Sequence, residues 1–358
     1  IAVVVELAEF LAVLLLSQIG GYRAYTNFGK TPHGGFYTKA DIEEIVAYAH
    51  ERFIKVIPEI DSPGHVVSAI AAYPHLSCFE RQLTVATHSG IYHDVLCIGK
   101  ESTFEFMFSV FDEICEMFPD RIIHIGGDEV PVTRWKICPD CQRKMKELGF
   151  ENEKQLYTYY IDRIAGYLEA KGFQIEMWNN KEIGDEVSKN IIKQYWDITP
   201  DGDCDETKTI DSESAAFYIN KPYGMTSIKN IYDHVPSCGG KKPLGVEACL
   251  WTEYVPTMKK AGYCVFPRLG AISETAWSKD ENRDYSRFLE KLPSYYKLLD
   301  TIPFDYAKKR QALPGPIRKH GYNLYFERQR LHWGGLHNIL DNKEVEKLAK
   351  SKGENKYD

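Results

Sequence analysis

The stretch that decides the fold is Arg121-Ile122-Ile123-His124-Ile125-Gly126-Gly127-Asp128-Glu129. Its first half is apolar on both faces, as a strand buried inside a parallel sheet must be. Its second half sets two glycines and two adjacent carboxylates directly after that strand. Because α/β barrels keep their active sites at the carboxyl ends of the strands, this order predicts catalysis by Asp128 and Glu129. The glycines remove side-chain bulk, so a ring-shaped ligand can approach the backbone closely.

Further apolar runs alternate with segments of helical periodicity, which is the pattern of βα units feeding a parallel sheet. Together with 121–125, the runs expected to form strands are 54–60, 174–178, 191–196, 214–219 and 245–251. Helices are expected at 104–118, 156–168 and 288–299. Another helix begins at a capping box of Thr38 and Asp41, and its apolar face is Ile42, Ile45, Val46 and Ala49. The pattern predicts an α/β fold of the (β/α)8 barrel type, with six of its eight strands visible.

The length of 358 residues fits one large domain with an appendage, since a single α/β barrel commonly occupies about 250 residues. No internal repeat or linker interrupts residues 20–300. We therefore expect an atypical apolar segment at 1–18, a catalytic barrel at 19–305 and an extension at 306–358. The apolar segment carries Glu6 and Glu9 and is shorter than the roughly 20 residues of a membrane span, so no membrane helix is expected.

The charge distribution excludes one class of partner. The chain has 44 basic and 51 acidic residues and a formal charge of −7, with the basic residues dispersed, so nucleic acid is not an expected partner. No signal-peptide pattern is visible at the start, which leaves the compartment open with a lean to the cytoplasm. The oligomeric state is also open.

The nine cysteines are spread along the chain and are odd in number, which favours mostly reduced thiols over a disulfide scaffold. Cys138 and Cys141 have CxxC spacing, but no second pair of Cys or His follows at zinc-finger distance. We therefore interpret them as an ordinary pair in a loop. The sequence predicts no metal and no cofactor.

Four motifs resemble one enzyme family in their expected order. His124 to Glu129 is similar to the HxGGDE signature of glycoside hydrolase family 20, the β-N-acetylhexosaminidases. The stretches PEIDSPGH (58–65), LWTE (250–253) and FPRLGAISETAW (266–277) resemble further motifs of the same family. The similarity runs from about residue 19 to residue 305. It implies a (β/α)8 barrel that removes terminal, non-reducing N-acetylhexosamine residues from oligosaccharides or glycoconjugates.

The resemblance implies a retaining, substrate-assisted mechanism, in which the 2-acetamido oxygen of the substrate attacks the anomeric carbon and gives an oxazolinium intermediate. Glu129 would be the general acid that protonates the leaving oxygen and later the base for water. Asp128 would accept the acetamido N–H and stabilise the positive charge of the intermediate. His65 matches a histidine near the scissile oxygen.

The resemblance also assigns substrate-binding residues. Tyr218 matches the tyrosine that donates to the acetamido oxygen. Asn220 stands where the family usually has Asp, which keeps hydrogen bonding and loses the charge. Glu253 matches the carboxylate that binds hydroxyls on the far side of the sugar. Aromatic residues that each end a predicted strand would box the acetamido methyl and the sugar face, and they are Trp178, Trp196 and Trp251.

Two expected features of the family are missing from this sequence: an Arg that clamps sugar hydroxyls and an HLTDDQGWR-like stretch. The first two βα units are thus predicted to be missing or replaced. Exposed sheet edges would follow unless residues 1–16 or a partner chain cover them. Substrate affinity should fall without the Arg, because a bidentate charged contact is lost.

Two other readings stay open. One is a truncated, catalytically impaired homologue that only binds carbohydrate. The other is an unrelated metal-dependent hydrolase that uses Asp61, His65 and His124. The choice between glucosamine and galactosamine derivatives, the linkage and the natural substrate are not readable from the sequence.

Overall fold

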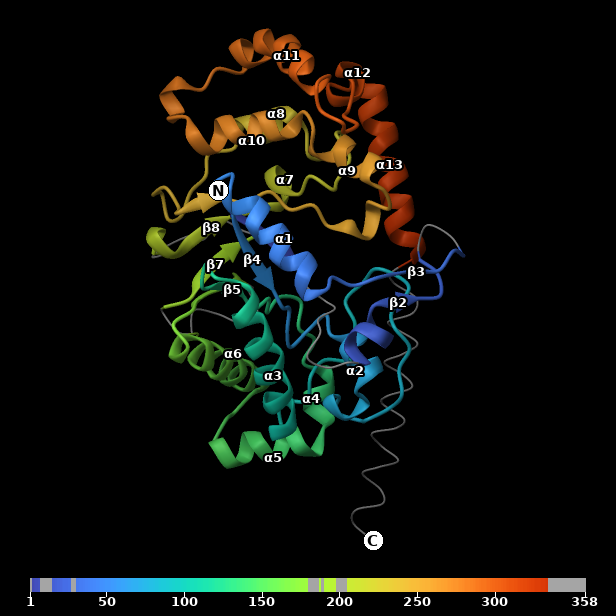
Figure 1. Cartoon of the computed structure of the whole chain (residues 1–358), viewed down its shortest axis with the longest axis vertical. Coiled ribbons are helices and arrows are strands. Elements are labelled where there is room, and N and C mark those ends of the chain that lie inside the picture. Colours follow the sequence, from blue (N-terminus) through green and yellow to red (C-terminus); the bar gives the residue numbers. More distant parts are fainter. Residues whose placement is uncertain are drawn as a thin grey trace. The chain divides into compact units, whose positions relative to one another are not determined.

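The computed structural model describes residues 2–6, 15–26, 30–179, 187, 190–197 and 205–333 (Figure 1). The chain divides into two compact units, unit 1 with Ile1–Ile192 and Trp333–Asp358, and unit 2 with Lys193–His332. Each unit has a hydrophobic core of its own. Both units lie largely within the stretch that the sequence assigns to the barrel, 19–305, and the domain boundaries stay a prediction.

Unit 1 is an α/β unit built on parallel strands. Its elements are β1 (Ala2–Glu6), β2 (Tyr22–Arg23), β3 (His33–Gly34), α1 (Lys39–His50), β4 (Lys55–Glu59), α2 (Val67–Ala72), α3 (Glu101–Met117), β5 (Ile122–His124), α4 (Thr133–Ile137), α5 (Pro139–Leu148), α6 (Glu153–Ala170) and β6 (Gln174–Asn179), with short helical turns at Leu16–Gly20 and Pro74–Leu76. Strands β1, β4, β5 and β6 pair in parallel in that order, and β2 with β3 forms a small antiparallel pair. The predicted strands at 54–60, 121–125 and 174–178 are confirmed.

The edge of β4 is covered by β1. Ala2 lies opposite Lys55 and Glu6 opposite Glu59 in a parallel register. A bare edge would present unpaired N–H and C=O groups to other chains. Of the two ways to cover this edge that the sequence left open, residues 2–6 provide one.

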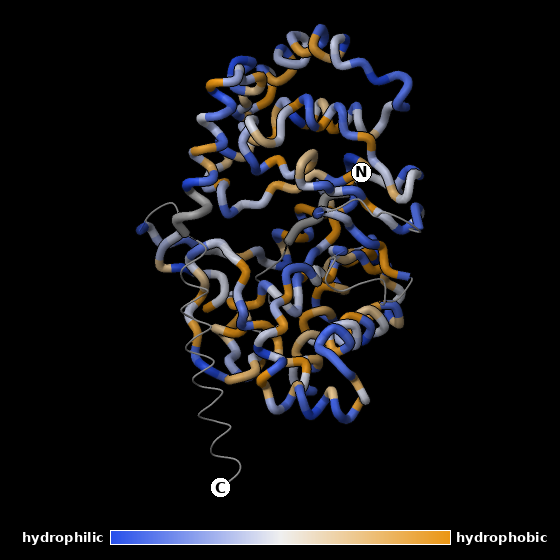
Figure 2. The backbone as a smooth tube through the Cα atoms, turned by 180° about the vertical axis from the view of Figure 1, so that it is seen from behind, coloured by the Kyte–Doolittle hydropathy of each residue, from blue (hydrophilic) through white to orange (hydrophobic). Residues whose placement is uncertain are grey.

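The helices of unit 1 begin and bury the faces that the sequence predicts. Thr38 caps α1, and its side chain accepts from the Asp41 N–H while Asp41 bonds back to Thr38. Ile42, Val46 and Ala49 are buried as predicted. The prediction for Ile45 is wrong, since this side chain is exposed at 36%. Helices α3 and α6 bury one apolar stripe each. Figure 2 shows the resulting alternation of apolar and hydrophilic segments along the helices.

Unit 2 is a second α/β unit. Its elements are β7 (Ile192–Tyr195), which starts at the last residue of unit 1, β8 (Thr209–Asp211), α7 (Ser214–Phe217), α8 (Ile228–Asp233), β9 (Gly245–Val246), α9 (Met258–Val265), α10 (Arg268–Trp277), α11 (Tyr285–Leu299), α12 (Lys309–Ala312) and α13 (Pro316–Trp333), with helical turns at Glu206–Lys208, Thr252–Tyr254 and Asp280–Asn282. Strands β7, β8 and β9 pair in parallel. The predicted strand at 191–196 and the helix at 288–299 are confirmed.

The predicted strand at 214–219 is wrong in its first half. Residues 209–211 take the place in the sheet, and the chain then turns into α7, where the Glu213 carbonyl accepts from the N–H groups of Ala216 and Phe217. Within 214–219 only Tyr218 pairs as a strand residue does, in a parallel bridge with Cys249, and the N–H of Ile219 in the following turn donates to the Cys249 carbonyl at 2.9 Å. An apolar run of mixed composition does not distinguish a strand from a buried helical turn.

The interpretation of Cys138 and Cys141 as an ordinary pair in a loop is wrong. Cys78 and Cys97 lie beside them in unit 1, so this pair does have further cysteines near it. None of the four forms a disulfide. Sequence spacing hides the group because Cys78 and Cys97 come from a long loop before α3.

The fold class that the sequence predicts is confirmed at the level of an α/β architecture with parallel strands. Closure into an eight-stranded barrel stays a prediction. Among the described residues, no helix is at once long and apolar enough to cross a bilayer.

Candidate active site

The turn after β5 is shaped by two glycines. Gly126 and Gly127 have φ angles of 69° and 100°, a region that favours glycine. A Cβ on Gly126 would lie 1.8 Å from the Asp61 Oδ1 atom. The Gly127 N–H donates to that same oxygen at 2.9 Å. The turn therefore packs directly against Asp61. A side chain at Gly126 would clash with Asp61, and a Cβ on Gly127 would lie 2.7 Å from the Tyr157 hydroxyl.

Asp128, Glu129 and His65 come together at the carboxyl ends of β4 and β5, as predicted for residues that follow parallel strands. The His65 Nε2 atom lies 3.4 Å from Glu129 Oε2 and 3.9 Å from Asp128 Oδ2. His65 and Glu129 have φ angles of 52° and 48°, which for residues with a Cβ costs about 1–3 kcal/mol each. Such strained backbone is found where function fixes a side chain.

Burial and charge perturb this group of side chains. Burial raises the pKa of Asp128, and the negative charges of Glu59 and Glu129 add to that effect although His65 opposes it. Burial alone would lower the pKa of His65, but its hydrogen bond to Glu129 and the charges of Asp61 and Asp128 raise that pKa to about 10. His65 is thus a cation at neutral pH, next to two carboxyl groups.

Trp178 lies in unit 1 and belongs to a buried network that sequence reasoning missed. Its indole N–H donates to Glu59 Oε1 at 2.7 Å, and His124 Nδ1 lies 3.3 Å from the same oxygen. The His124 and Trp178 rings meet edge to face at 5.1 Å. Burial would raise the pKa of Glu59, but His124 and Trp178 lower it. The sequence contained a signal for this network, because a Glu inside the buried run 54–60 needs hydrogen-bond partners.

Tyr157 on α6 is a second residue that the sequence did not indicate. Its hydroxyl donates to the Gly127 carbonyl at 2.8 Å, and it is fully buried. Burial raises the pKa of Tyr157, so it stays a neutral donor. This bond and the one from Gly127 to Asp61 fix the backbone that carries Asp128. No pattern of residue types in the sequence identifies such a support.

The metal-dependent alternative named Asp61, His65 and His124, and the structure brings only the first two together. Asp61 and His65 do come together, with Asp128 as the third member, and their candidate ligand atoms lie within 4.8 Å of one another. His124 is instead bound to Glu59 beneath the site. The grouping therefore differs from the one that the sequence suggested.

Unit 2 holds an aromatic set made of Trp196, Tyr218 and Trp251. The Trp196 and Tyr218 rings stack with centroids 6.3 Å apart and an interplanar angle of 19°. Trp251 meets Tyr218 edge to face at 5.9 Å. All three rings are partly exposed. The indole N–H of Trp196 is buried and has no hydrogen-bond partner among the described residues. The set offers aromatic faces and a phenol hydroxyl to a ligand.

Asn220 comes two residues after Tyr218 in the chain, and Glu253 comes two residues after Trp251. Asn220 is buried, and its Oδ1 has no hydrogen-bond partner in the described part of the chain. Glu253 is exposed on the turn Thr252–Tyr254. The assignment of both as substrate-binding residues stays a prediction.

Arg268 supports the segment that carries Tyr218 and Asn220. It is fully buried at the start of α10 and donates to the backbone carbonyls of Ile219, Lys221 and Cys264. Its guanidinium also lies over the Tyr223 ring at 3.7 Å. Burial lowers the pKa of Arg268 from its ordinary value, and it remains charged. Arg268 belongs to a motif that is visible in the sequence, but this supporting role was not predicted.

Comparison with known proteins identifies relatives along most of the chain. Residues 9–280 match the profile described as "Glycosyl hydrolase family 20, catalytic domain". A β-hexosaminidase of Porphyromonas gingivalis is 32% identical over 321 residues, which cover 84% of this chain and 41% of that protein. The β-hexosaminidase α subunit of Rattus norvegicus is 32% identical, and the match covers 74% of this chain and 54% of the subunit.

Solved structures agree with these sequence matches. A β-N-acetylhexosaminidase of Bacteroides fragilis superposes with a TM-score of 0.71 at 27% identity, covering 88% of this chain and 68% of that one. An exo-β-N-acetylglucosaminidase of Vibrio harveyi in complex with N-acetylglucosamine gives 0.72 at 25% identity, covering 84% and 52%. The chain spans 41–59% of the length of the first curated relatives. It belongs to glycosyl hydrolase family 20, with the family's catalytic domain matched at residues 9–280.

Proposed function

We propose that this chain removes terminal N-acetylhexosamine residues by the retaining, substrate-assisted route through an oxazolinium intermediate. One observation carries the proposal: the Asp128 side chain is 14% exposed, but its Oδ1 atom is buried and has no hydrogen-bond partner among the described residues. A buried acceptor without a partner is costly unless a ligand supplies the donor. The N–H of a 2-acetamido group is such a donor.

In this mechanism Glu129 acts as the general acid. Its side chain is 31% exposed, so a leaving oxygen and later a water molecule can reach it. The His65 cation holds Glu129 by hydrogen bonding and offsets the negative charge of the carboxyl pair. Asp128 orients the acetamido group, whose oxygen attacks the anomeric carbon, and stabilises the positive charge that develops. Water then opens the oxazolinium ring with Glu129 as base, and the configuration is retained.

The residues of unit 2 bind the sugar in this proposal. Tyr218 donates its hydroxyl hydrogen to the acetamido oxygen, and Trp196 and Trp251 contact the acetamido methyl and the sugar face. Glu253 accepts from sugar hydroxyls and Asn220 hydrogen-bonds at the position where the family usually has Asp. Trp178 is buried and donates its indole N–H to Glu59 at the end of β4, which it supports. N-acetylglucosamine is the first sugar to test, since it is the ligand in the Vibrio harveyi relative.

The test compares two nitrophenyl glycosides that differ only at carbon 2, one with the acetamido group and one with a hydroxyl. We expect nitrophenol release from the N-acetylglucosaminide alone, and NMR should show the β-anomer of the sugar as the first product. Equal cleavage of the plain glucoside would contradict participation of the acetamido group. First release of the α-anomer would contradict retention.

A carbohydrate-binding protein without turnover is the second candidate. It is favoured by the lack of the family's Arg clamp in this sequence. A thiazoline analogue of the oxazolinium intermediate distinguishes the two. Binding of the analogue together with hydrolysis supports the enzyme, whereas binding without hydrolysis selects the second candidate.

A further inference from the structure

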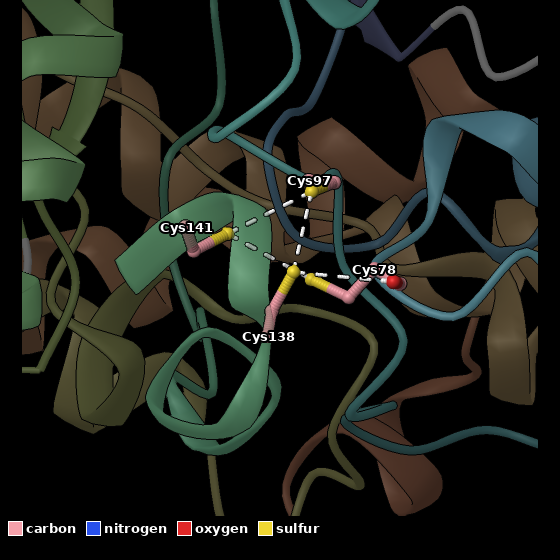
Figure 3. Close-up of side chains that lie close together, drawn as sticks. All are labelled: Cys78, Cys97, Cys138 and Cys141. Carbon is pink, nitrogen blue, oxygen red and sulfur yellow. Dashed lines mark hydrogen bonds between the residues drawn. The ribbon is translucent and has the colours of Figure 1, made fainter. Parts of the chain in front are cut away.

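Four cysteine side chains meet in the interior of unit 1 (Figure 3). Cys78 follows the turn Pro74–Leu76, Cys97 lies shortly before α3, and Cys138 and Cys141 belong to the start of α5. All four are buried, with exposed fractions between 0% and 9%. Their sulfur atoms all lie within 4.8 Å of one another and face a common centre.

The sulfur-to-sulfur distances fit a single metal ion. Cys97 Sγ lies 3.7 Å from both Cys138 Sγ and Cys141 Sγ, and Cys78 Sγ lies 3.9 Å from Cys141 Sγ. In a regular tetrahedron with metal–sulfur bonds of about 2.3 Å, neighbouring sulfur atoms are about 3.8 Å apart. A cluster of several irons and sulfides needs more room between its ligands. A disulfide needs about 2.05 Å, so the four are not bridged in pairs.

The backbone holds these segments in contact. A Cβ on Gly99 would lie 2.2 Å from the carbonyl carbon of Asp140 and 2.4 Å from the Cys141 nitrogen, so only glycine lets the two segments approach. The Cys97 N–H donates to the Leu76 carbonyl at 2.8 Å. The loop that bears Cys78 and Cys97 is thus fixed against the start of α5 by features other than the thiols.

The start of α5 brings partial positive charge close to two of the four sulfurs. Cys138 is the residue before the first turn of α5 and Cys141 lies in that turn, where the helix N–H groups point. The Lys100 ammonium donates to the carbonyls of His75 and Ser77 in the same loop at 2.9 and 3.0 Å and pairs with the Glu80 carboxylate at 2.6 Å, so it holds the loop. The start of α5 offsets part of the negative charge of a tetrathiolate.

We propose that Cys78, Cys97, Cys138 and Cys141 bind one Zn²⁺ ion in a closed structural site. Zn²⁺ binds four thiolates tetrahedrally and undergoes no redox change. Binding replaces four S–H protons, which are released to solvent, by four Zn–S bonds and leaves the site with a charge of −2. Since all four positions are taken by sulfur, no water or substrate reaches the ion and it takes no part in the reaction.

The site would join the two loops that carry the catalytic group. Cys78 and Cys97 belong to the loop between β4 and α3 that begins near His65, and Cys138 and Cys141 follow Glu129 in the chain. The Leu96 N–H donates to the Pro63 carbonyl at 3.0 Å, two residues from His65. The metal cross-link would stabilise a long loop that few regular elements hold. Its loss would loosen the contact between His65 and Glu129.

The first experiment measures metal in the unmodified protein. The full chain is purified with zinc present, dialysed and analysed by plasma mass spectrometry, and about one zinc per chain is expected. An organomercurial that attacks thiolates should release that zinc stoichiometrically to a coloured chelator, because the thiolates are the ligands. Refolding with Co²⁺ should give the intense absorption bands of a tetrahedral cobalt–thiolate site.

The second experiment uses matched variants. Cys138→Ser and Cys141→Ser should each lose the bound zinc and lower the thermal midpoint. Cys264→Ser is the control, because Cys264 is equally buried but belongs to unit 2 and is not a member of the group. It should keep one zinc. If the two variants do not fold, the metal content and the cobalt spectrum of the unmodified protein decide the question.

Several results would overturn the proposal. These are unmodified protein with no metal and no cobalt–thiolate spectrum, one iron per chain in place of zinc, or mass spectra that show a disulfide between any two of the four cysteines. Retention of zinc by both Cys138→Ser and Cys141→Ser would overturn it as well. None of these readouts depends on glycosidase activity, so failure of the proposed function leaves them unaffected.

Discussion

The two regions to which the proposed function assigns the substrate differ in kind. The group of Asp128, Glu129 and His65 in unit 1 is charged, closely spaced and held by backbone hydrogen bonds and strained φ angles. The aromatic set of Trp196, Tyr218 and Trp251 in unit 2 consists of partly exposed rings that contact one another by their faces and edges. The first arrangement suits proton transfer, which depends on tenths of an ångström, and the second suits recognition of a sugar face. Substitutions in the first should therefore change kcat, and those in the second should change KM.

The largest effect is expected at the general acid. Glu129→Gln should lower kcat on an N-acetylhexosaminide with a poor leaving group about 10²–10⁴-fold, because the leaving oxygen is no longer protonated. A nitrophenyl leaving group needs less protonation and should show a smaller loss. Glu116→Gln is the control, since Glu116 is exposed on α3 and pairs with Lys39. Equal losses on both leaving groups would contradict the acid role.

Asp128→Asn separates catalysis from stability. We expect a loss in kcat of about 10²-fold, because a neutral amide stabilises the cationic intermediate less well. The pKa of Asp128 is raised by burial, so the charged carboxylate destabilises the fold once the pH rises above that pKa. The variant should accordingly be more stable than the unmodified protein at pH 7, and the difference should shrink in acid. Urea unfolding at pH 7 and in acid measures this difference in the free energy of unfolding. A variant that is less stable than the unmodified protein at pH 7 would contradict a raised pKa for Asp128.

A smaller effect is expected in the aromatic set. Trp196→Leu should raise KM up to about tenfold with little change in kcat, because stacking on a sugar face contributes about 0.5–1.5 kcal/mol. Trp277→Leu is the matched control, since Trp277 is 77% exposed on α10 of the same unit. A fall in kcat of the size seen for Glu129→Gln would break the division between the two regions.

The smallest effect concerns pH and His65. The folded pKa of His65, about 10, lies above the ordinary histidine pKa of 6.5, so the stability that His65 contributes is complete below about pH 6.5 and is lost as the pH rises through 10. The free energy of unfolding should fall more steeply across this window in the unmodified protein than in His65→Gln. Parallel curves for the two proteins would show that His65 is not a cation in the folded state.

The sequence predicted what depends on neighbouring residues. The order of apolar strand, two glycines and two carboxylates at 121–129 is local, and the structure has it as expected, as it has the cap at Thr38. Sequence-based prediction failed where the contacting residues are distant in the chain. Trp178 donates to Glu59, which lies more than one hundred positions earlier, and Cys97 contacts Cys141 although α3, β5 and α4 separate them in the sequence. Sequence-based prediction also failed at 214–219, where short apolar runs fit a strand and a helical turn equally well.

The left-handed backbone at Glu129 limits how this protein can be improved. Glycine adopts that conformation without the cost of a Cβ, so Glu129→Gly would relieve the strain while it removes the proposed acid. A screen for heat-resistant variants would therefore tend to select inactive ones at this position. Selection for retained turnover has to accompany any such screen, because here stability and chemistry make opposite demands on a single residue.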